Sequence, residues 1–355
     1  MERSDATYVA RNSSFEFLRI IAQYMIVIYH VLLFWFIHRG IEPIQVYKAI
    51  CIPLHIGVIL YVLISGYYGI RFSLKGVLKI IANLLVYGLL LSLVGHFWLG
   101  DEFGVKELFF VSNSPFWFVK AYLMLYLVAP LVNKMIRGIS VNNRSLLLLL
   151  LLLLWASCFV GFLGFDDSLQ GGKNLIHFIL LYLIGNTLAL YKDRINQTSM
   201  HWVILGYVLV NALSIGTYLI CTGTKLEGIS YAFAFQYNSP ILILNAVLLF
   251  VPFMRMNFCN RTINYLASSC FAVYLIHSAL LFLNHPIKAA AMYIQTLTDN
   301  VTLIILMVCA LSLIIMSGCV ILDKLMFPYW KLVDRTTIKL NKTKIGEIAT
   351  QWANQ

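Results

Sequence analysis

Charged residues are scarce in this sequence of 355 residues. They make up 12% of the chain, whereas about 25% is usual in a soluble globular domain. Hydrophobic residues make up 61%, and the mean hydropathy is +0.83. This composition excludes an ordinary soluble protein and predicts an all-α integral membrane protein.

Motifs typical of soluble enzymes and metalloproteins are also missing. The sequence has no glycine-rich phosphate loop, no dinucleotide fingerprint, no zinc motif and no internal repeat. Its seven cysteines show no paired spacing, so we expect neither a disulfide framework nor a metal site. The first sixteen residues are polar and the first apolar run is long enough to span a bilayer, so we expect no cleavable signal peptide.

Long apolar runs, in contrast, are abundant. A bilayer core requires about 20 apolar residues per helix. Runs of about this length occur at residues 17–38, 49–70, 78–99, 115–136, 145–165, 174–191, 201–222, 239–256, 263–284 and 301–326. We therefore predict about ten transmembrane helices in one membrane domain over residues 1–330, followed by a basic tail over residues 331–355.

The distribution of basic residues predicts the orientation. If the N-terminus is cytoplasmic, 19 of the 26 Lys and Arg residues fall on the cytoplasmic side, as the positive-inside rule requires. Both termini, and the basic tail with them, are then expected in the cytoplasm. The same bias explains the net charge of +11, so no nucleic-acid partner is expected.

The first apolar run contains ionisable residues. Arg19, Gln23 and His30 share one helix face, because eleven residues make about three turns, and His30 lies roughly 16 Å deeper than Arg19. Ionisable groups are costly in a membrane and usually mark a function. Histidine can take a proton from a hydroxyl group near neutral pH. We therefore predict that His30 is functional.

The other histidines give weaker signals. His55 and His277 fall in the outer half of the predicted membrane, and each could be either a functional group or a helix contact. We expect the remaining five at interfaces or in helix packing: His38, His96, His177, His201 and His285.

Four motifs, in order along the predicted spans, resemble a known family. The first is an arginine, ten residues and a histidine, Arg19 to His30. The others are "VLISGYYGIRFS" closing the second span, "SPFWFVKAYLMLYLVAPLVN" in the fourth and "SCFAVYLIHSALL" in the ninth. Together they resemble the membrane acyltransferase-3 family, whose members move acetyl or related groups onto cell-surface sugars.

The resemblance implies an acyl-CoA-dependent O-acyltransferase in a bacterial plasma membrane. The expected donor is cytoplasmic acetyl-CoA, and the expected acceptor is a hydroxyl group of a surface or lipid-linked polysaccharide. His30 would act as general base or transient acyl carrier, and Arg19 would bind the donor. Basic residues expected near the CoA phosphates are Arg19, Arg71, Lys75 and Lys79. Residues expected to contact substrates are Glu16, Gln23, His55, Ser65, Trp117, Tyr126 and His277.

Other interpretations stay open for some of these residues. Ser65 could simply allow close helix packing, and the aromatic residues could anchor the membrane interface. A polysaccharide exporter or flippase is the alternative function, but few charged residues fall within the predicted spans. No tightly bound cofactor is expected, the partners are acyl-CoA, the glycan acceptor and membrane lipid, and a homo-oligomer is left open.

Overall fold

A computed structural model describes residues 12–105, 116–139, 143–154 and 171–354, together with Phe109, Val111 and Ala156. All regular elements in the described residues are helical. The α-helices are α1 (Ser14–Leu32), α2 (Ile44–Leu54), α3 (Gly57–Tyr68), α4 (Leu74–Asn83), α5 (Leu91–Leu99), α6 (Trp117–Ile139), α7 (Asn143–Leu154), α8 (Leu175–Leu190), α9 (Lys192–Gln197), α10 (Met200–Cys221), α11 (Glu227–Phe235), α12 (Pro240–Arg255), α13 (Arg261–Ala267), α14 (Cys270–Ser278), α15 (Leu280–Phe282), α16 (Lys288–Leu297), α17 (Val301–Leu325), α18 (Phe327–Asn341) and α19 (Lys344–Asn354). Three wider π-helical segments are η1 (Leu33–Ile37), η2 (Leu84–Leu90) and η6 (Leu283–Ile287).

Several helical stretches are long and apolar enough to cross a membrane, and the chain is a multi-pass membrane protein. Seven such stretches occur in the described residues: Ser14–Ile37, Ile44–Tyr68, Leu74–Leu99, Trp117–Gly138, Met200–Cys221, Glu227–Arg255 and Val301–Leu325. Each overlaps one of the ten predicted spans. Three of these stretches are single helices, and the other four join two or three elements, as the first joins α1 and η1.

The other three predicted spans are shorter or broken. In the run 145–165, α7 ends at Leu154, and most of the remaining residues lie outside the described part. Helix α8 has 16 residues, fewer than a full span. The ninth span is bent by 69° between Arg261–Ser278 and Leu283–Leu297. The described chain therefore gives seven spans, or eight if the bent pair counts as one, and the number ten stays a prediction.

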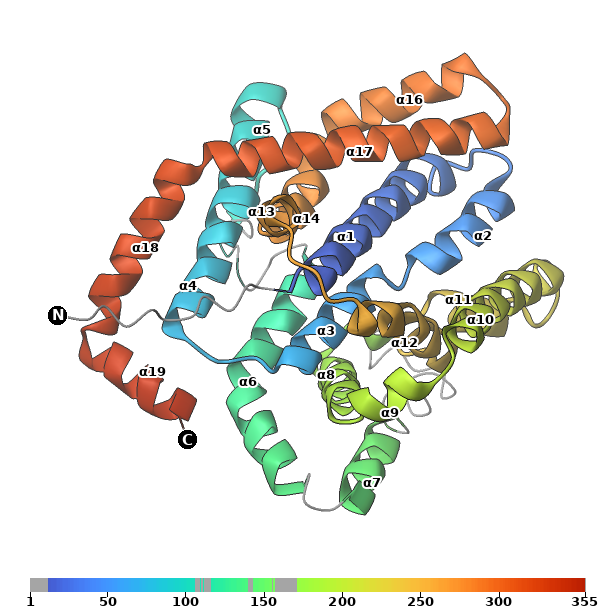
Figure 1. Ribbon diagram of the computed structural model, residues 1–355. Coiled ribbons are helices and arrows are strands. Elements are labelled where there is room, and N and C mark those ends of the chain that lie inside the picture. The colour runs from blue at the N-terminus through green and yellow to red at the C-terminus, as the bar shows by residue number, and fades with distance from the viewer. Residues whose placement is uncertain are drawn as a thin grey trace.

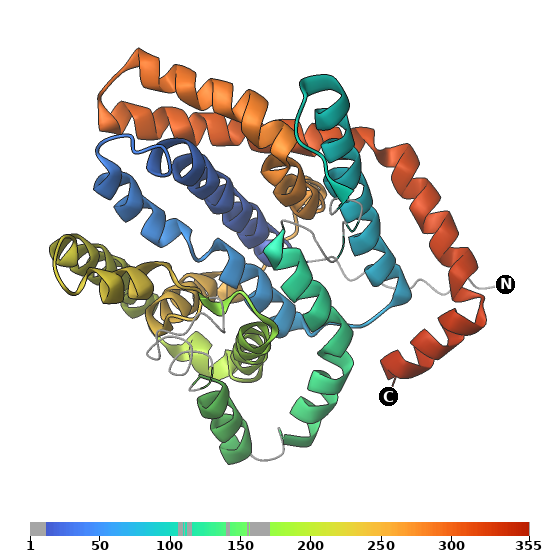
Figure 2. The same ribbon diagram turned by 180° about the vertical axis from the view of Figure 1, so that it is seen from behind.

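Helix α1 lies at the centre of the bundle. It contacts α3, α14 and α17 along its length, and Figures 1 and 2 show it enclosed by these helices from both sides. Leu18, Ala22 and Val27 on α1 are fully buried in the main hydrophobic core. Polar residues of α1 are buried as well: Gln23 is fully buried and Glu16 is 4% exposed. The helix that carries the predicted arginine and histidine is thus shielded from lipid.

Helices α3 and α8 approach each other at two glycines. A Cβ atom on Gly66 would overlap the backbone of Tyr182, and one on Gly185 would overlap the backbone of Leu63. Small residues allow such close backbone packing between membrane helices. Helix α3, which carries Ser65 and begins two residues after His55, therefore packs tightly against α8.

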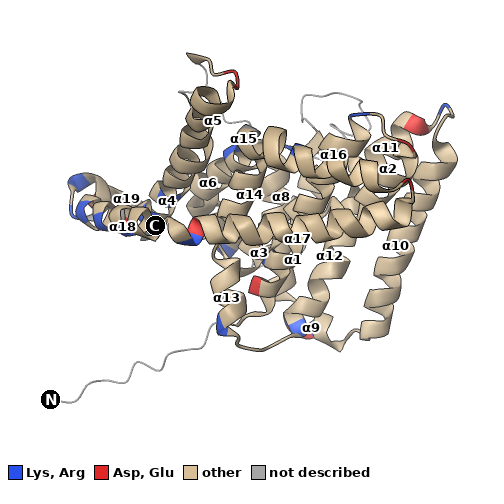
Figure 3. Cartoon of the chain, turned by 90° about the horizontal axis from the view of Figure 1, so that it is seen from above, with Lys and Arg blue, Asp and Glu red and all other residues tan. Residues whose placement is uncertain are grey.

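The predicted C-terminal tail is helical. Residues 331–354 form most of α18 and α19, which contact α4, and α19 also contacts α6. The Phe72 and Trp352 rings meet edge to face, with centroids 4.8 Å apart. Figure 3 shows Lys and Arg residues gathered on α18 and α19, whereas the long central helices are mostly uncharged.

The predicted orientation can be tested by cysteine labelling. In a background lacking the exposed Cys259, Thr222→Cys at the end of α10 should react with an impermeant maleimide added outside cells. Lys344→Cys at the start of α19 should react only after the membrane is permeabilised, because the positive-inside rule places α19 in the cytoplasm. The reverse pattern would contradict the orientation.

Candidate functional site

Two histidines from distant parts of the chain lie side by side. His30 Nδ1 on α1 is 2.9 Å from His277 Nε2 on α14, and the rings are 5.1 Å apart between centroids, at an angle of 28°. His277 is 1% exposed. Ser278 Oγ lies 3.2 Å from His277 Nε2 and 3.4 Å from His30 Nδ1. The two histidines therefore form one hydrogen-bonded unit.

The hydrogen bonds indicate how protons are arranged on this unit. His277 Nδ1 is 2.6 Å from the Val273 carbonyl oxygen, which can only accept, so Nδ1 carries the proton. The neutral ring then presents a lone pair at Nε2, and His30 Nδ1 donates to it. This assignment leaves the lone pair of His30 on Nε2, the ring nitrogen not held by His277. In this tautomer His30 Nε2 can accept a proton.

Helix α14 is held at its start by a buried carboxylate and ends after nine residues. Asp323 on α17 accepts hydrogen bonds from Ser269 Oγ at 2.6 Å, Tyr87 Oη at 2.9 Å and Trp330 Nε1 at 3.2 Å. Ser269 is the residue just before α14, so this cluster anchors the start of the helix. The helix ends at Ser278, because the next residue has an extended backbone. His277 consequently lies in the last turn of a short, anchored helix.

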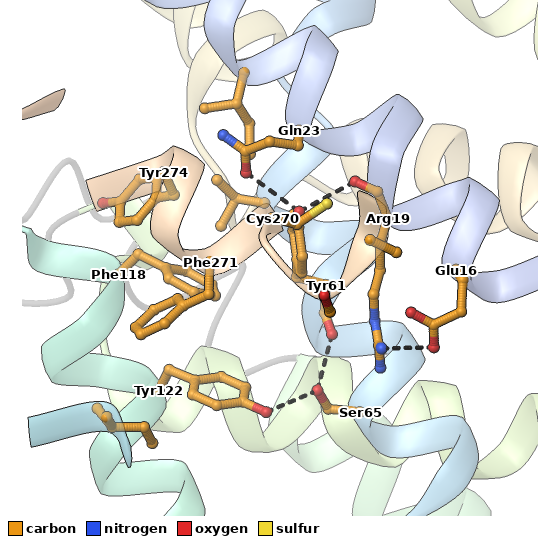
Figure 4. A pocket seen from close by; sticks show the side chains of 15 residues that line it. Glu16, Arg19, Gln23, Tyr61, Ser65, Phe118, Tyr122, Cys270, Phe271 and Tyr274 are labelled. Carbon is orange, nitrogen blue, oxygen red and sulfur yellow. Dashed lines mark hydrogen bonds and ion pairs between the residues drawn. The ribbon is translucent and has the colours of Figure 1, made fainter. Parts of the chain in front are cut away.

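A cavity of about 260 Å³ surrounds Arg19, and we call it the Arg19 cavity. Arg19 Nη1 pairs with Glu16 Oε1 at 2.8 Å, and the Tyr61 hydroxyl donates to Gln23 Oε1 at 3.2 Å. Gln23 Nε2 is buried and has no hydrogen-bond partner in the described chain. Figure 4 shows Arg19 and Glu16 at one end of this cavity and Tyr274 at the other. The cavity thus offers a guanidinium group and a free amide donor.

A second cavity, of about 510 Å³, contains His30 and is called the His30 cavity. Its walls are mainly aromatic and include Trp117, with the Lys173 ammonium group 5.6 Å from that ring. The His55 ring stacks on Tyr237 with centroids 4.3 Å apart and is 6% exposed. Aromatic faces beside the polar side chains of His55 and Lys173 suit a ligand that has both apolar faces and hydroxyl groups.

A small space of about 20 Å³, which we call the constriction, lies between the two cavities. It shares Ile26, Val58 and Tyr274 with the Arg19 cavity, and it also contains His30 and His55. Helices α1 and α14 each line the Arg19 cavity, the constriction and the His30 cavity in that order along the helix, and α6 lines the constriction and the His30 cavity with Trp117 and the Arg19 cavity with Phe118 and Tyr122. The three spaces are therefore stacked along one line beside α1.

The basic residues predicted near CoA are placed apart from Arg19. Lys75 and Lys79 pair with Asp334 of α18 at 3.0 and 3.7 Å, and the Lys75 hydrogen bond in particular holds the pKa of the Asp334 carboxyl below its ordinary value. Arg71 does not line the Arg19 cavity. Lys79 lines a neighbouring cavity of about 490 Å³ together with Lys324, which sequence reasoning did not single out.

Of the remaining predicted residues, Ser65 lines a cavity and Tyr126 supports the backbone of a turn. Ser65 lines the Arg19 cavity and lies 3.2 Å from the Tyr122 hydroxyl. Tyr126 lies outside the Arg19 and His30 cavities, and its hydroxyl accepts from the Ser73 amide at 3.2 Å, so it holds the turn before α4.

Sequence reasoning missed two further groups. Tyr274 lines all three spaces and lies three residues before His277, so the spacing of "YLIH" could have indicated a shared face. Tyr237, the stacking partner of His55, has no such signal. No cluster of three or more potential metal ligands occurs among the residues that the structure describes.

Comparison with known proteins identifies the family of the chain. Neither a curated protein nor a solved structure matches the sequence. The family model described as an acyltransferase domain matches residues 12–322, well over half of the chain. This range contains Arg19, His30 and His277, and it ends within α17. The chain belongs to the acyltransferase-3 family of membrane acyltransferases.

Proposed function

We propose that this protein transfers an acyl group, foremost acetyl, from cytoplasmic acyl-CoA to a hydroxyl group of a surface or lipid-linked polysaccharide. We place it in a bacterial plasma membrane. The observation that supports this most is the His30–His277 pair at the junction of the two stacked cavities. A base placed there can meet a donor from one side and an acceptor from the other.

The Arg19 cavity suits the pantetheine arm of the donor. Its free Gln23 amide group and the Arg19 guanidinium can bind the amide and thioester carbonyls of the arm. Because Glu16 already neutralises Arg19, the phosphates fit better in the neighbouring cavity with Lys79 and Lys324. That cavity shares Ser268 and Phe271 with the Arg19 cavity, so one molecule can extend through both. Arg71 and Lys75 would add to the field that attracts the phosphates.

The His30 cavity suits the acceptor. Trp117 and Tyr237 can stack on the apolar faces of a sugar ring, and the His55 imidazole can bind one of its hydroxyl groups. His30 Nε2 would take the proton of the reacting hydroxyl, whose oxygen attacks the thioester carbon. The C–O bond forms, the C–S bond breaks, and the proton passes from His30 to the CoA thiolate. In a two-step variant, His30 Nε2 itself carries the acyl group briefly before the hydroxyl takes it.

An oxyanion forms at the thioester carbonyl in either route. Tyr29 and Tyr274 line the constriction, so their hydroxyl groups are candidates to stabilise this charge. His277 would keep the His30 tautomer correct and would stabilise the imidazolium that forms. Ser65 would act indirectly by holding Tyr122.

The alternative function, export of a polysaccharide, is disfavoured by the constriction. A space of about 20 Å³ holds only one or two water-sized groups, far less than a sugar ring. The two functions are distinguished by deleting the gene and restoring it. Loss of a transferase lowers base-labile acetate on the surface carbohydrate without changing the amount of carbohydrate. Loss of an exporter lowers the amount of carbohydrate itself, and that result would contradict the proposal.

Arg19→Lys is expected to lower kcat/KM for acyl-CoA by about 10- to 100-fold. A hydrogen bond to a charged group is worth about 1.5–3 kcal/mol, and a lysine cannot reproduce the planar guanidinium fork. The measurement is the acetyl-CoA dependence of transfer in membranes at matched protein level. Arg71→Lys is the matched control, because it keeps the charge of a residue outside the Arg19 cavity. Equal losses in both variants would show that Arg19 has no special contact with the donor.

A further inference from the structure

The constriction is the smallest of the three spaces along α1, and His30, the proposed base, lines it. It is lined by His30 and, on the side of the Arg19 cavity, by Ile26, Val58 and Tyr274. A thioester that reaches His30 from the Arg19 cavity must therefore place its acyl group in this space. This step rests on the function proposed above.

The size of the constriction limits what can fit. Its volume is about 20 Å³, against about 260 and 510 Å³ for the cavities on either side. By the same measure, one water requires roughly 10–15 Å³. A methyl group and a carbonyl oxygen fill this space, whereas each further methylene has no room.

The chemistry of the walls also limits the acyl group. Ile26 and Val58 are aliphatic, and the described residues around the constriction include no lysine or arginine. A carboxylate at the end of a succinyl group would lose its hydration there without gaining a cation. An uncharged acyl group is favoured.

The walls are held in place by helix packing. Ile26 and Val58 are 5% and 7% exposed and belong to the hydrophobic core. A Cβ atom on Gly57 would lie 2.8 Å from the Ala22 carbonyl oxygen and 2.9 Å from Ile26 Cγ1, so α1 and α3 are in close contact at this level. The constriction cannot widen there without separating the two helices.

From size, chemistry and packing, we infer that Ile26 and Val58 are specificity-determining residues that restrict the donor to acetyl-CoA. They act as a steric limit on acyl length at the point where His30 performs the transfer.

The test uses radiolabelled acetyl-, propionyl-, butyryl- and succinyl-CoA. Membranes from cells of the source organism that lack the gene supply the acceptor, and the purified protein is reconstituted into them.

The wild-type protein should prefer acetyl by at least about 10-fold over butyryl, because one methylene in a fitted pocket changes the rate about 10- to 200-fold. Val58→Ala should raise the butyryl-to-acetyl ratio of label in carbohydrate about 10-fold or more. Val62→Ala, also buried on α3 but outside all three spaces, should leave the ratio unchanged.

The possible outcomes distinguish failure of the inference about Ile26 and Val58 from failure of the proposed function. An active Val58→Ala protein with unchanged chain-length preference would overturn the inference, and so would a wild-type protein that uses butyryl as well as acetyl. If Val58→Ala does not fold, Ile26→Val gives the same test with a smaller cavity change, and an unchanged ratio there overturns the inference equally. If the wild-type protein labels no carbohydrate with any donor, the proposed function itself is wrong.

Discussion

Cells that carry His30→Ala should make surface carbohydrate with almost no ester-linked acyl groups. General-base catalysis is typically worth 10²–10⁴-fold in rate, and His30, the proposed base, lines both the constriction and the His30 cavity. The variant should still insert in the membrane, because it removes a polar group that is costly in lipid. The measurement is base-labile acetate per unit of carbohydrate at matched protein level.

The control for this experiment is His201→Ala. His201 is exposed on α10 and lies outside both cavities, so its loss should leave acylation at the parental value. If His30→Ala acylates at close to the parental rate, His30 has only a structural role, and the proposed mechanism loses its base.

His277→Ala should lower kcat roughly 100-fold while leaving KM for acyl-CoA nearly unchanged. Without the acceptor at His277 Nε2, the Nδ1 proton of His30 is no longer held, and His30 can adopt the tautomer that blocks the base. Loss of the tautomer-holding aspartate in a serine protease costs about 10⁴ in kcat, and a neutral partner should cost less. The KM is spared because His277 does not line the Arg19 cavity.

A conservative variant separates this positioning role from simple packing. His277→Gln can place an amide oxygen near the position of Nε2, where it accepts from His30 Nδ1. Partial recovery of kcat, about 10-fold above His277→Ala, is expected. If His277→Gln and His277→Ala are equally impaired, or if KM rises as much as kcat falls, His277 does not act through the His30 tautomer.

The sequence predicted much of the helical architecture, because the length of an apolar run is visible directly. It did not predict the break at Ser278, since neither glycine nor proline marks that position. The face shared by Arg19, Gln23 and His30 was also predictable, because it depends only on helical periodicity. It appears in the structure as the wall of the two cavities.

Contacts between distant residues could not be predicted in the same way. His30 and His277 are 247 residues apart, and the sequence indicated only that they lie at similar depth. The same limit applies to Lys75, whose partner Asp334 lies on a helix that was expected to be a tail. A cluster of basic residues in one segment does not show which carboxylates from elsewhere in the chain will neutralise it.

The narrow passage beside α1 also has a consequence for the electrical insulation of the membrane. Two water-accessible cavities on opposite sides of a bilayer would form an ion leak if a column of water joined them. The constriction, which Ile26 and Val58 help to line, has room for only about one or two waters, fewer than a hydrated ion carries. Hydrophobic constrictions exclude ions by expelling water. If the proposed transfer takes place across the bilayer, the same side chains would let it proceed without dissipating the ion gradients that the cell maintains.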